Sequence, residues 1–170
     1  IELGLVGSEM CIRDSLRVDP NTLDTLLHPT LDETKEVKTI AKGLPASPGA
    51  TSGKVVFSSD EAERLNGMMQ DTILVRVETS PEDIHGMHAA KGILTARGGM
   101  TSHAAVVARG MGRPCVSGSS EINIDYENKL FKTDKIQVSE GEIITIDGST
   151  GRIILGEVQT KNKSLKIQAL

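Results

Sequence analysis

The sequence has 170 residues, of which 38% are hydrophobic and 25% are charged, and its formal net charge is -4. This length and composition are typical of one water-soluble domain with tails, large enough to bury a core. The acidic balance and the scarcity of aromatic residues argue against a nucleic-acid-binding surface. No apolar run approaches the length that crosses a membrane.

The first 42 residues are predicted to precede the compact domain. Residues 1–15 show no helical or strand period and resemble a translated adapter sequence, so we interpret them as a non-native segment. A natural N-terminal arm is the alternative. Residues 16–42 are polar and contain two prolines, which predicts a linker or docking arm. Residues 158–170 are polar and lysine-rich, and we interpret them as a second linker that is cut short.

The compact domain is predicted over residues 43–157. Its hydrophobic runs and turn signals predict an alternation of strands and helices, followed by a β-rich part. Strands are expected at 54–57, 72–77, 92–96, 115–118, 135–138, 142–146 and 152–155, and helices at 59–69, 81–90 and from 101 or 102 to Gly110. This order predicts a mixed α/β domain.

The clearest chemical signal lies in residues 97–112, which read RGGMTSHAAVVARGMG. A strand is predicted to end there, and a helix to begin at Thr101 or Ser102. The first turn of a helix has backbone N–H groups without partners, and with the helix dipole these donors form an anion site. Gly98 and Gly99 allow a phosphate to approach the backbone closely. Thr101 and Ser102 add hydroxyl groups, one of which caps the helix.

His103 follows these hydroxyls and is the candidate nucleophile. The positive end of the helix dipole disfavours a protonated imidazole, and a neutral imidazole can attack an electrophile. Arg97 flanks the glycine loop and could contact a phosphate carried on His103. The alternative from the residues alone is a capped surface histidine without a chemical role, because glycine loops before helices are common.

A longer stretch around this motif resembles a known family. Residues 92–118, GILTARGGMTSHAAVVARGMGRPCVSG, are similar to the signature of the mobile phosphohistidine domain in phosphoenolpyruvate-utilizing enzymes. The similarity extends to residues 26–32, 42–57 and 134–157. The shared core positions are Gly98, Gly99, Thr101, His103, Ala108 and Arg109.

The resemblance implies a fold and a role. The fold is a swivelling β/β/α phosphohistidine domain of the α/β class, with His103 carrying a phosphoryl group. The implied phosphate pocket contains Arg97, Gly98, Gly99, Thr101 and Ser102. Thr101 also matches a threonine that a regulatory kinase modifies in this family.

The resemblance also implies partners that lie outside this chain. An ATP-grasp nucleotide-binding domain would phosphorylate the histidine from ATP and phosphate, and a C-terminal barrel domain would pass the group to pyruvate, giving phosphoenolpyruvate. Mg²⁺ would be bound in those flanking domains, with no metal site in this chain. The whole enzyme is expected to be a cytoplasmic homodimer that binds neither nucleic acid nor membrane.

Three alternatives remain open at this point. Met100, Ser102 and the segment 110–118 favour the branch of the family that uses ATP, phosphate and pyruvate together. The corresponding domain of phosphoenolpyruvate synthase and that of Enzyme I of the sugar phosphotransferase system are two alternatives. A non-catalytic module with the same fold is the third.

Other chemically active residues are given structural interpretations. His85 and His88 stand three apart on a predicted helix, and a solvated helix face is favoured over a metal site. Arg109 lies nearly two turns beyond His103 and is predicted to brace the domain or dock on a partner. Cys115 is predicted to be a buried structural thiol, and the absence of cysteine-pair motifs indicates a reduced, cytoplasmic protein.

Overall fold

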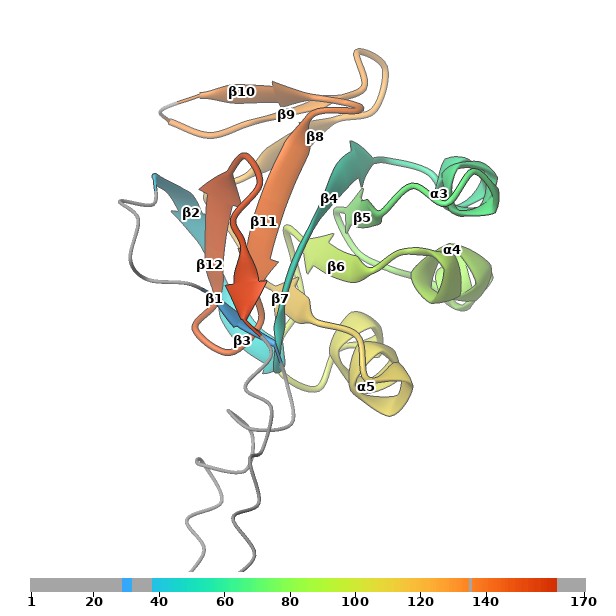
Figure 1. The fold of residues 1–170 in the computed structure, drawn as a ribbon, viewed down its shortest axis with the longest axis horizontal. Helices are drawn as coiled ribbons and strands as arrows, with labels where there is room; N and C mark the ends of the chain where they lie inside the picture. The colour runs from blue at the N-terminus through green and yellow to red at the C-terminus, as the bar shows by residue number, and fades with distance from the viewer. Residues whose placement is uncertain (1–28, 32–37, 135, 162–170) are drawn as a thin grey trace, which may run out of the picture.

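The computed structural model describes residues 29–31, 38–134 and 136–161, which form an α/β domain (Figure 1). Its elements in chain order are β1 (Thr30–Leu31), β2 (Thr39–Lys42), β3 (Leu44–Ser47), β4 (Ala50–Val56), α3 (Ser59–Gly67), β5 (Thr72–Arg76), the 3₁₀ helix η1 (Pro81–Asp83), α4 (Ile84–Ala89), β6 (Gly92–Thr95), α5 (His103–Met111), β7 (Cys115–Ser117), β8 (Asn123–Asp125), β9 (Leu130–Lys132), β10 (Gln137–Ser139), β11 (Ile143–Asp147), β12 (Arg152–Leu155) and β13 (Thr160–Lys161).

The centre of the domain is an eight-stranded mixed sheet with the strand order β2-β12-β11-β4-β5-β6-β7-β3. β4, β5, β6 and β7 run parallel to one another. The outer strands pair antiparallel with their neighbours. Each connection between successive parallel strands contains a helix, and α3, α4 and α5 lie along one face of the sheet (Figure 1). The connections that leave the carboxyl ends of the parallel strands therefore meet at one edge of the sheet.

Apolar side chains fill a core on each face of the large sheet. Successive residues of a strand point to opposite faces, so Leu74 of β5 packs with Met87 of α4 on the helical side. Its neighbour Ile73 belongs to the other core, which also contains Phe131 and Val138. These two residues come from the three-stranded sheet β10-β9-β8. A small sheet, a large sheet and a helical layer thus stack in order, which confirms the expected β/β/α fold.

The domain begins before the expected boundary at residue 43. Residues 39–42 were interpreted as linker, but they form β2, which pairs with β12, and Ile40 and Ala41 are buried. At the other end, β13 pairs with β1, although residues from 158 onward were interpreted as linker. The interpretations of residues 1–15, 16–28, 32–37 and 162–170 concern segments outside the described residues.

Within the domain the predicted elements are present with shifted bounds, apart from three corrections. The predicted helix at 81–90 is divided into η1 and α4. The strands β3, β8 and β9 were not predicted. The prediction that the third helix ends at Gly110 is wrong, because α5 continues to Met111 and Gly112 takes the left-handed conformation at its end. Among the described residues, no helix is long and apolar enough to cross a membrane.

Candidate functional site

The candidate site lies at the sheet edge where β5, β6 and β7 end. The connection from β5 carries Thr79, the connection from β6 carries the glycine loop and His103, and the connection from β7 begins at Gly118. Residues far apart in the sequence are thus brought together by strand order. The site is built on the ends of fixed strands, which holds its side chains in defined positions.

His103 is the first residue of α5, and Ser102 is its N-cap. The Ser102 hydroxyl accepts a hydrogen bond from the Ala105 backbone N–H at 3.4 Å, so the cap is Ser102 rather than Thr101. Ala104, Ala105 and Ala108 form the buried face of the helix. These small side chains allow α5 to pack closely on the sheet, and the His103 ring remains half-buried at the start of the helix.

The far end of α5 is held by two features. The Arg109 guanidinium donates a hydrogen bond of 2.7 Å to the Ala46 carbonyl of β3, which confirms its predicted role as a brace. Gly112 ends the helix with φ of +65°, and its N–H bonds to the Ala108 and Arg109 carbonyls. A glycine is favoured at this position because a side chain would be strained in the left-handed region. Both ends of the helix that presents His103 are therefore fixed.

The glycine loop before α5 is held close to the strand β7. Gly98 has φ of +111°, a conformation that side chains disfavour. The Gly99 carbonyl accepts hydrogen bonds from the Ser102 N–H at 3.0 Å and from the Ser117 hydroxyl at 3.3 Å. A Cβ atom built on Gly99 would meet nothing within 4 Å. The loop is thus anchored on one side and borders open space on the other.

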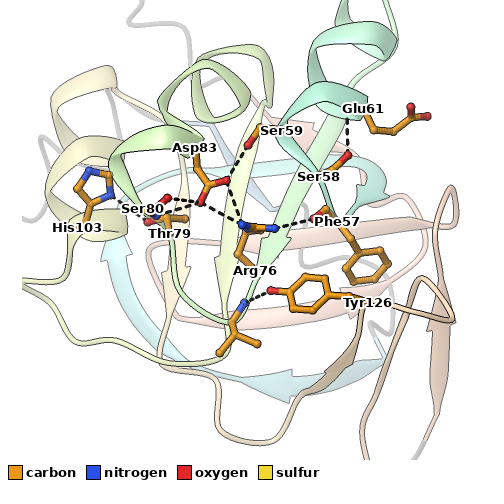
Figure 2. Close-up of polar contacts among 11 residues, drawn as sticks. Phe57, Ser58, Ser59, Glu61, Arg76, Thr79, Ser80, Asp83, His103 and Tyr126 are labelled. Atoms are coloured by element: carbon orange, nitrogen blue, oxygen red, sulfur yellow. Dashed lines mark hydrogen bonds and ion pairs between the residues drawn. The ribbon is translucent and has the colours of Figure 1, made fainter.

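The imidazole of His103 is held by a hydroxyl from the neighbouring connection (Figure 2). His103 Nδ1 lies 3.2 Å from the Thr79 Oγ1 atom. Among the described residues this is the one hydrogen bond that the ring makes, so Nε2 has no partner among them. A hydroxyl can donate to or accept from Nδ1, according to the tautomer of the ring.

Behind Thr79, a buried carboxylate ties the β5 connection to the rest of the domain (Figure 2). Asp83 accepts hydrogen bonds from the Ser80 backbone N–H at 2.9 Å and the Ser59 hydroxyl at 2.8 Å. The Arg76 guanidinium lies 3.3 Å from the same carboxylate. Burial acts to raise the pKa of Asp83, but these hydrogen bonds and the Arg76 charge outweigh burial and hold the pKa below its ordinary value.

The structure brings together some of the predicted pocket residues and not others. Gly98, Gly99 and Ser102 lie in the loop and cap that lead directly into His103. Thr101 is exposed in the turn before the helix. Arg97 is also exposed, and its backbone N–H bonds to the Val77 carbonyl at 2.9 Å. Within the described ranges, no contact joins the side chain of Arg97 or Thr101 to the imidazole.

Thr79 and Asp83 were missed as site residues by sequence reasoning. The segment TSPED, residues 79–83, was interpreted only as the start of the predicted helix at 81–90. A topological signal was present, because this segment follows the strand that is parallel and adjacent to β6. Residues that follow neighbouring parallel strands lie at the same sheet edge, and this rule points to Thr79.

The remaining candidates have structural environments. Cys115 is fully buried among apolar side chains, and burial raises the pKa of its thiol to about 12, which confirms the prediction of a buried structural thiol. His85 and His88 lie on the exposed face of α4, as the solvated-face interpretation predicts. In the described part of the chain, no group of three or more His, Cys, Asp or Glu residues could hold a metal ion.

Comparison with known proteins gives one family. Residues 68–151 match the family model described as the mobile domain of PEP-utilising enzymes. A pyruvate, phosphate dikinase of Rhizobium meliloti is 57% identical over 157 residues, which is 92% of this chain and 17% of the relative. The pyruvate, phosphate dikinase of Clostridium symbiosum is 50% identical over 97% of this chain and 19% of the relative.

A plant relative gives the same result. The chloroplastic pyruvate, phosphate dikinase 1 of Arabidopsis thaliana is 53% identical over 91% of this chain and 16% of the relative. The chain therefore spans less than a fifth of the length of these three relatives. All the site residues described above, from Thr79 to Gly118, lie within the matched range 68–151.

Proposed function

Because this chain belongs to the family of PEP-utilising enzyme mobile domains, we propose that it is a phosphoryl carrier in which His103 is the acceptor. One observation carries the proposal. The His103 ring stands at the first position of α5, and its Nδ1 atom is engaged by Thr79 at 3.2 Å. The Nε2 atom is thereby left as the nucleophile.

The hydrogen bond to Thr79 suits this chemistry in one tautomer. When the proton is on Nδ1 and the Thr79 oxygen accepts it, Nε2 carries the lone pair. Nε2 then attacks the donor phosphorus, an N–P bond forms, and the P–O bond to the leaving group breaks. The leaving oxygen keeps the bonding electrons. The Nδ1 proton stays on the ring and continues to be donated to Thr79, which stabilises the positive charge that the phosphorylated ring acquires.

The start of α5 provides donors for the transferred phosphoryl group. The first-turn N–H groups and the positive end of the helix dipole favour an anion at this position. The open space beside Gly99 leaves room for phosphate oxygens next to the backbone. We place the hydroxyls of Ser102 and Thr101 and the guanidinium of Arg97 around this group, the last two by reorientation of exposed side chains.

The similarity to dikinases supports a more detailed proposal for the whole protein. We propose that His103 is phosphorylated from ATP and phosphate at an ATP-grasp domain, and that a barrel domain then transfers the phosphoryl group to pyruvate, giving AMP, diphosphate and phosphoenolpyruvate. The described residues of this chain do not fit a metal site, so we assign Mg²⁺ to those flanking domains. The proposed whole enzyme is a cytoplasmic homodimer, although one relative is named as chloroplastic.

We also propose that Thr101 is a regulatory position. Its side chain is exposed one residue before the helix cap, where a modifying enzyme can reach it. A phosphate on Thr101 would add about 1.5 to 2 negative charges beside the acceptor. It would also compete with phosphohistidine for the first-turn N–H groups.

The decisive experiment is transfer of labelled phosphate. The chain is incubated with labelled phosphoenolpyruvate and the barrel domain of a dikinase relative. Label is expected on His103, in an acid-labile and base-stable form. His103→Ala should accept none, while His88→Ala, a control on the exposed face of α4, should accept as much as the unsubstituted chain. Undiminished labelling of His103→Ala would overturn the proposal.

A further inference from the structure

We infer that Asp83 is a positioning residue for His103 that acts through Ser80 and Thr79. Asp83 lies in η1, which precedes α4, and it makes no direct contact with the imidazole among the described residues. The inference rests on the proposed function, because it assigns Asp83 a part in presenting the proposed nucleophile. Figure 2 shows the chain of contacts from the carboxylate to the ring.

The first step concerns the carboxylate itself. Asp83 is 5% exposed and joins three separate elements. Ser59 of α3 donates to its Oδ1 at 2.8 Å, Arg76 of β5 lies 3.3 Å from Oδ1, and the Ser80 N–H donates to Oδ2 at 2.9 Å. A buried carboxylate is stable only when charges and donors compensate it, and here the donors come from the segments that surround the site.

The second step concerns the segment that carries Thr79. On one side of Thr79, the Val77 N–H bonds to the Tyr126 hydroxyl at 2.8 Å, and the Val77 carbonyl accepts from the Arg97 N–H at 2.9 Å. On the other side, Ser80 is held by Asp83, and the Asp83 N–H bonds back to the Ser80 carbonyl at 3.0 Å. The backbone is therefore fixed on both sides of Thr79, and Asp83 supplies the second anchor.

The base of this segment also has contacts that do not involve Asp83. The Arg76 guanidinium donates to the Phe57 carbonyl at 3.2 Å and lies 5.5 Å from the centre of the Tyr126 ring. Tyr126 in turn packs edge-on against Phe57. Loss of the Asp83 charge would leave these contacts in place, so the change should be felt chiefly at Ser80 and Thr79.

The third step concerns the imidazole. The distance of 3.2 Å between Thr79 Oγ1 and His103 Nδ1 selects one ring orientation, and when the hydroxyl accepts from Nδ1 it also holds the proton on that nitrogen. A buried carboxylate that fixes the segment carrying such a hydroxyl acts on the nucleophile without touching it, as outer partners do for metal-bound histidines. If the Ser80 anchor loosens, the ring can rotate, the proton can move to Nε2, and the nucleophilic lone pair is lost from the exposed nitrogen.

The test uses the full 170-residue chain and the small reagent phosphoramidate, which phosphorylates imidazole nitrogens without a partner domain. Asp83→Asn keeps the side-chain shape and removes the charge. The matched control is Glu61→Gln. This substitution also removes the charge of a carboxylate that is paired with an arginine, Arg64, but the pair lies on α3. Nitrogen NMR of the His103 ring reports the tautomer, and phosphorus NMR reports the rate and the nitrogen that is phosphorylated.

The unsubstituted chain is expected to hold the proton on Nδ1 and to be phosphorylated on Nε2 of His103. Asp83→Asn should give a mixture of tautomers and phosphorylate about fivefold more slowly, the effect of losing about one ordinary hydrogen bond. Glu61→Gln should match the unsubstituted chain. Because Asp83 acts through Thr79, the double variant Asp83→Asn/Thr79→Val should be no slower than Thr79→Val alone.

Several outcomes separate this inference from the proposed function. Unchanged tautomer and rate in Asp83→Asn, or additive effects in the double variant, would overturn the role of Asp83 while leaving His103 as acceptor. A proton on Nε2 in the unsubstituted chain would also overturn it. Phosphorylation of His103→Ala at the full rate would instead overturn the function. If Asp83→Asn does not fold, Ser80→Ala keeps the bond from the Ser80 N–H to Asp83 and removes the 3.3 Å hydroxyl contact, and a smaller slowing in the same direction is expected.

Discussion

The absence of a side chain at Gly118 is predicted to let the glycine loop lie close to the β7 connection, and Gly118→Ala tests this. A Cβ atom built on Gly118 would lie well under 3.0 Å from the Gly98 carbonyl oxygen, which is a backbone atom. The loop that precedes His103 must then move, because backbone cannot yield as the end of a flexible side chain can. The substitution should therefore affect both the stability of the domain and the presentation of the imidazole.

The magnitude follows from two contributions. Gly118 has φ of +63°, and an alanine in this left-handed region costs about 1–2 kcal/mol. The overlap with Gly98 adds about 1–3 kcal/mol, as for other forced insertions into well-packed sites. Gly112 isolates the second contribution, since its φ is +65° but a Cβ there would meet nothing within 4 Å. Gly112→Ala should therefore show the conformational cost alone.

The assay is urea unfolding of both variants, followed by phosphorylation with phosphoramidate. We expect Gly118→Ala to lose about 1–3 kcal/mol more stability than Gly112→Ala and to accept phosphate more slowly. Gly112→Ala should accept phosphate at the rate of the unsubstituted chain. Equal losses of stability together with equal rates would refute the claim that the contact between Gly118 and Gly98 shapes the site.

Three further predictions test charge and burial. Thr101→Glu should nearly abolish labelling of His103 while Thr101→Ser largely preserves it, and normal labelling of the glutamate variant would place this position outside the phosphate pocket. Cys115 should not react with iodoacetamide at pH 8 in the folded chain, because burial raises its pKa to about 12; peptide mapping that finds rapid modification would contradict this. The folded-state pKa of Asp83 is lowered, so its carboxylate stabilises the fold above about pH 4 and this contribution is lost as the pH falls through that pKa. Asp83→Asn should then have a lower free energy of unfolding in urea at pH 7, and this free energy should fall less steeply below pH 4 than that of the unsubstituted chain. The same dependence on pH in both chains would contradict the prediction.

The sequence was sufficient to predict the α/β class and to place the start of α5 within two residues, because these depend on local signals. Ser102 caps α5 through a contact three residues away, which is the kind of pattern that a sequence displays directly. The end of the same helix was predicted one residue early. Gly110 and Gly112 both suit a helix end, and the sequence alone does not say which one takes the left-handed conformation.

The missed strands depend on distant pairing. β2 pairs with β12, more than a hundred residues later in the chain, and its short sequence TIAK has a weak strand pattern of its own. β3 contains Pro45, which lowers a strand prediction, yet β3 lies at the end of the sheet order, and proline is tolerated on such an edge strand. Tertiary pairing, rather than local propensity, decides these segments.

The same limit applies to the site. The motif from Gly98 to His103 is contiguous and was found, whereas Thr79 lies 24 residues from His103 and was not. Hydroxyl side chains are frequent in turns, so the residue composition of a turn does not show which hydroxyl contacts a ring. The order of parallel strands supplies the missing information, because it makes the β5 and β6 connections neighbours.

The separate roles of the three connections fit the proposed carrier function. The β6 connection carries the proposed nucleophile and the proposed anion site, the β5 connection contacts the ring through Thr79, and the β7 connection lies against the loop at Gly118. A group that receives phosphate at one protein surface and gives it up at another must be reachable by both. A half-buried imidazole at a sheet edge meets this need, and its orientation must then come from its own domain rather than from an enclosing cleft. This explains why a buried network extends from Asp83 to a ring that is itself partly open to solvent.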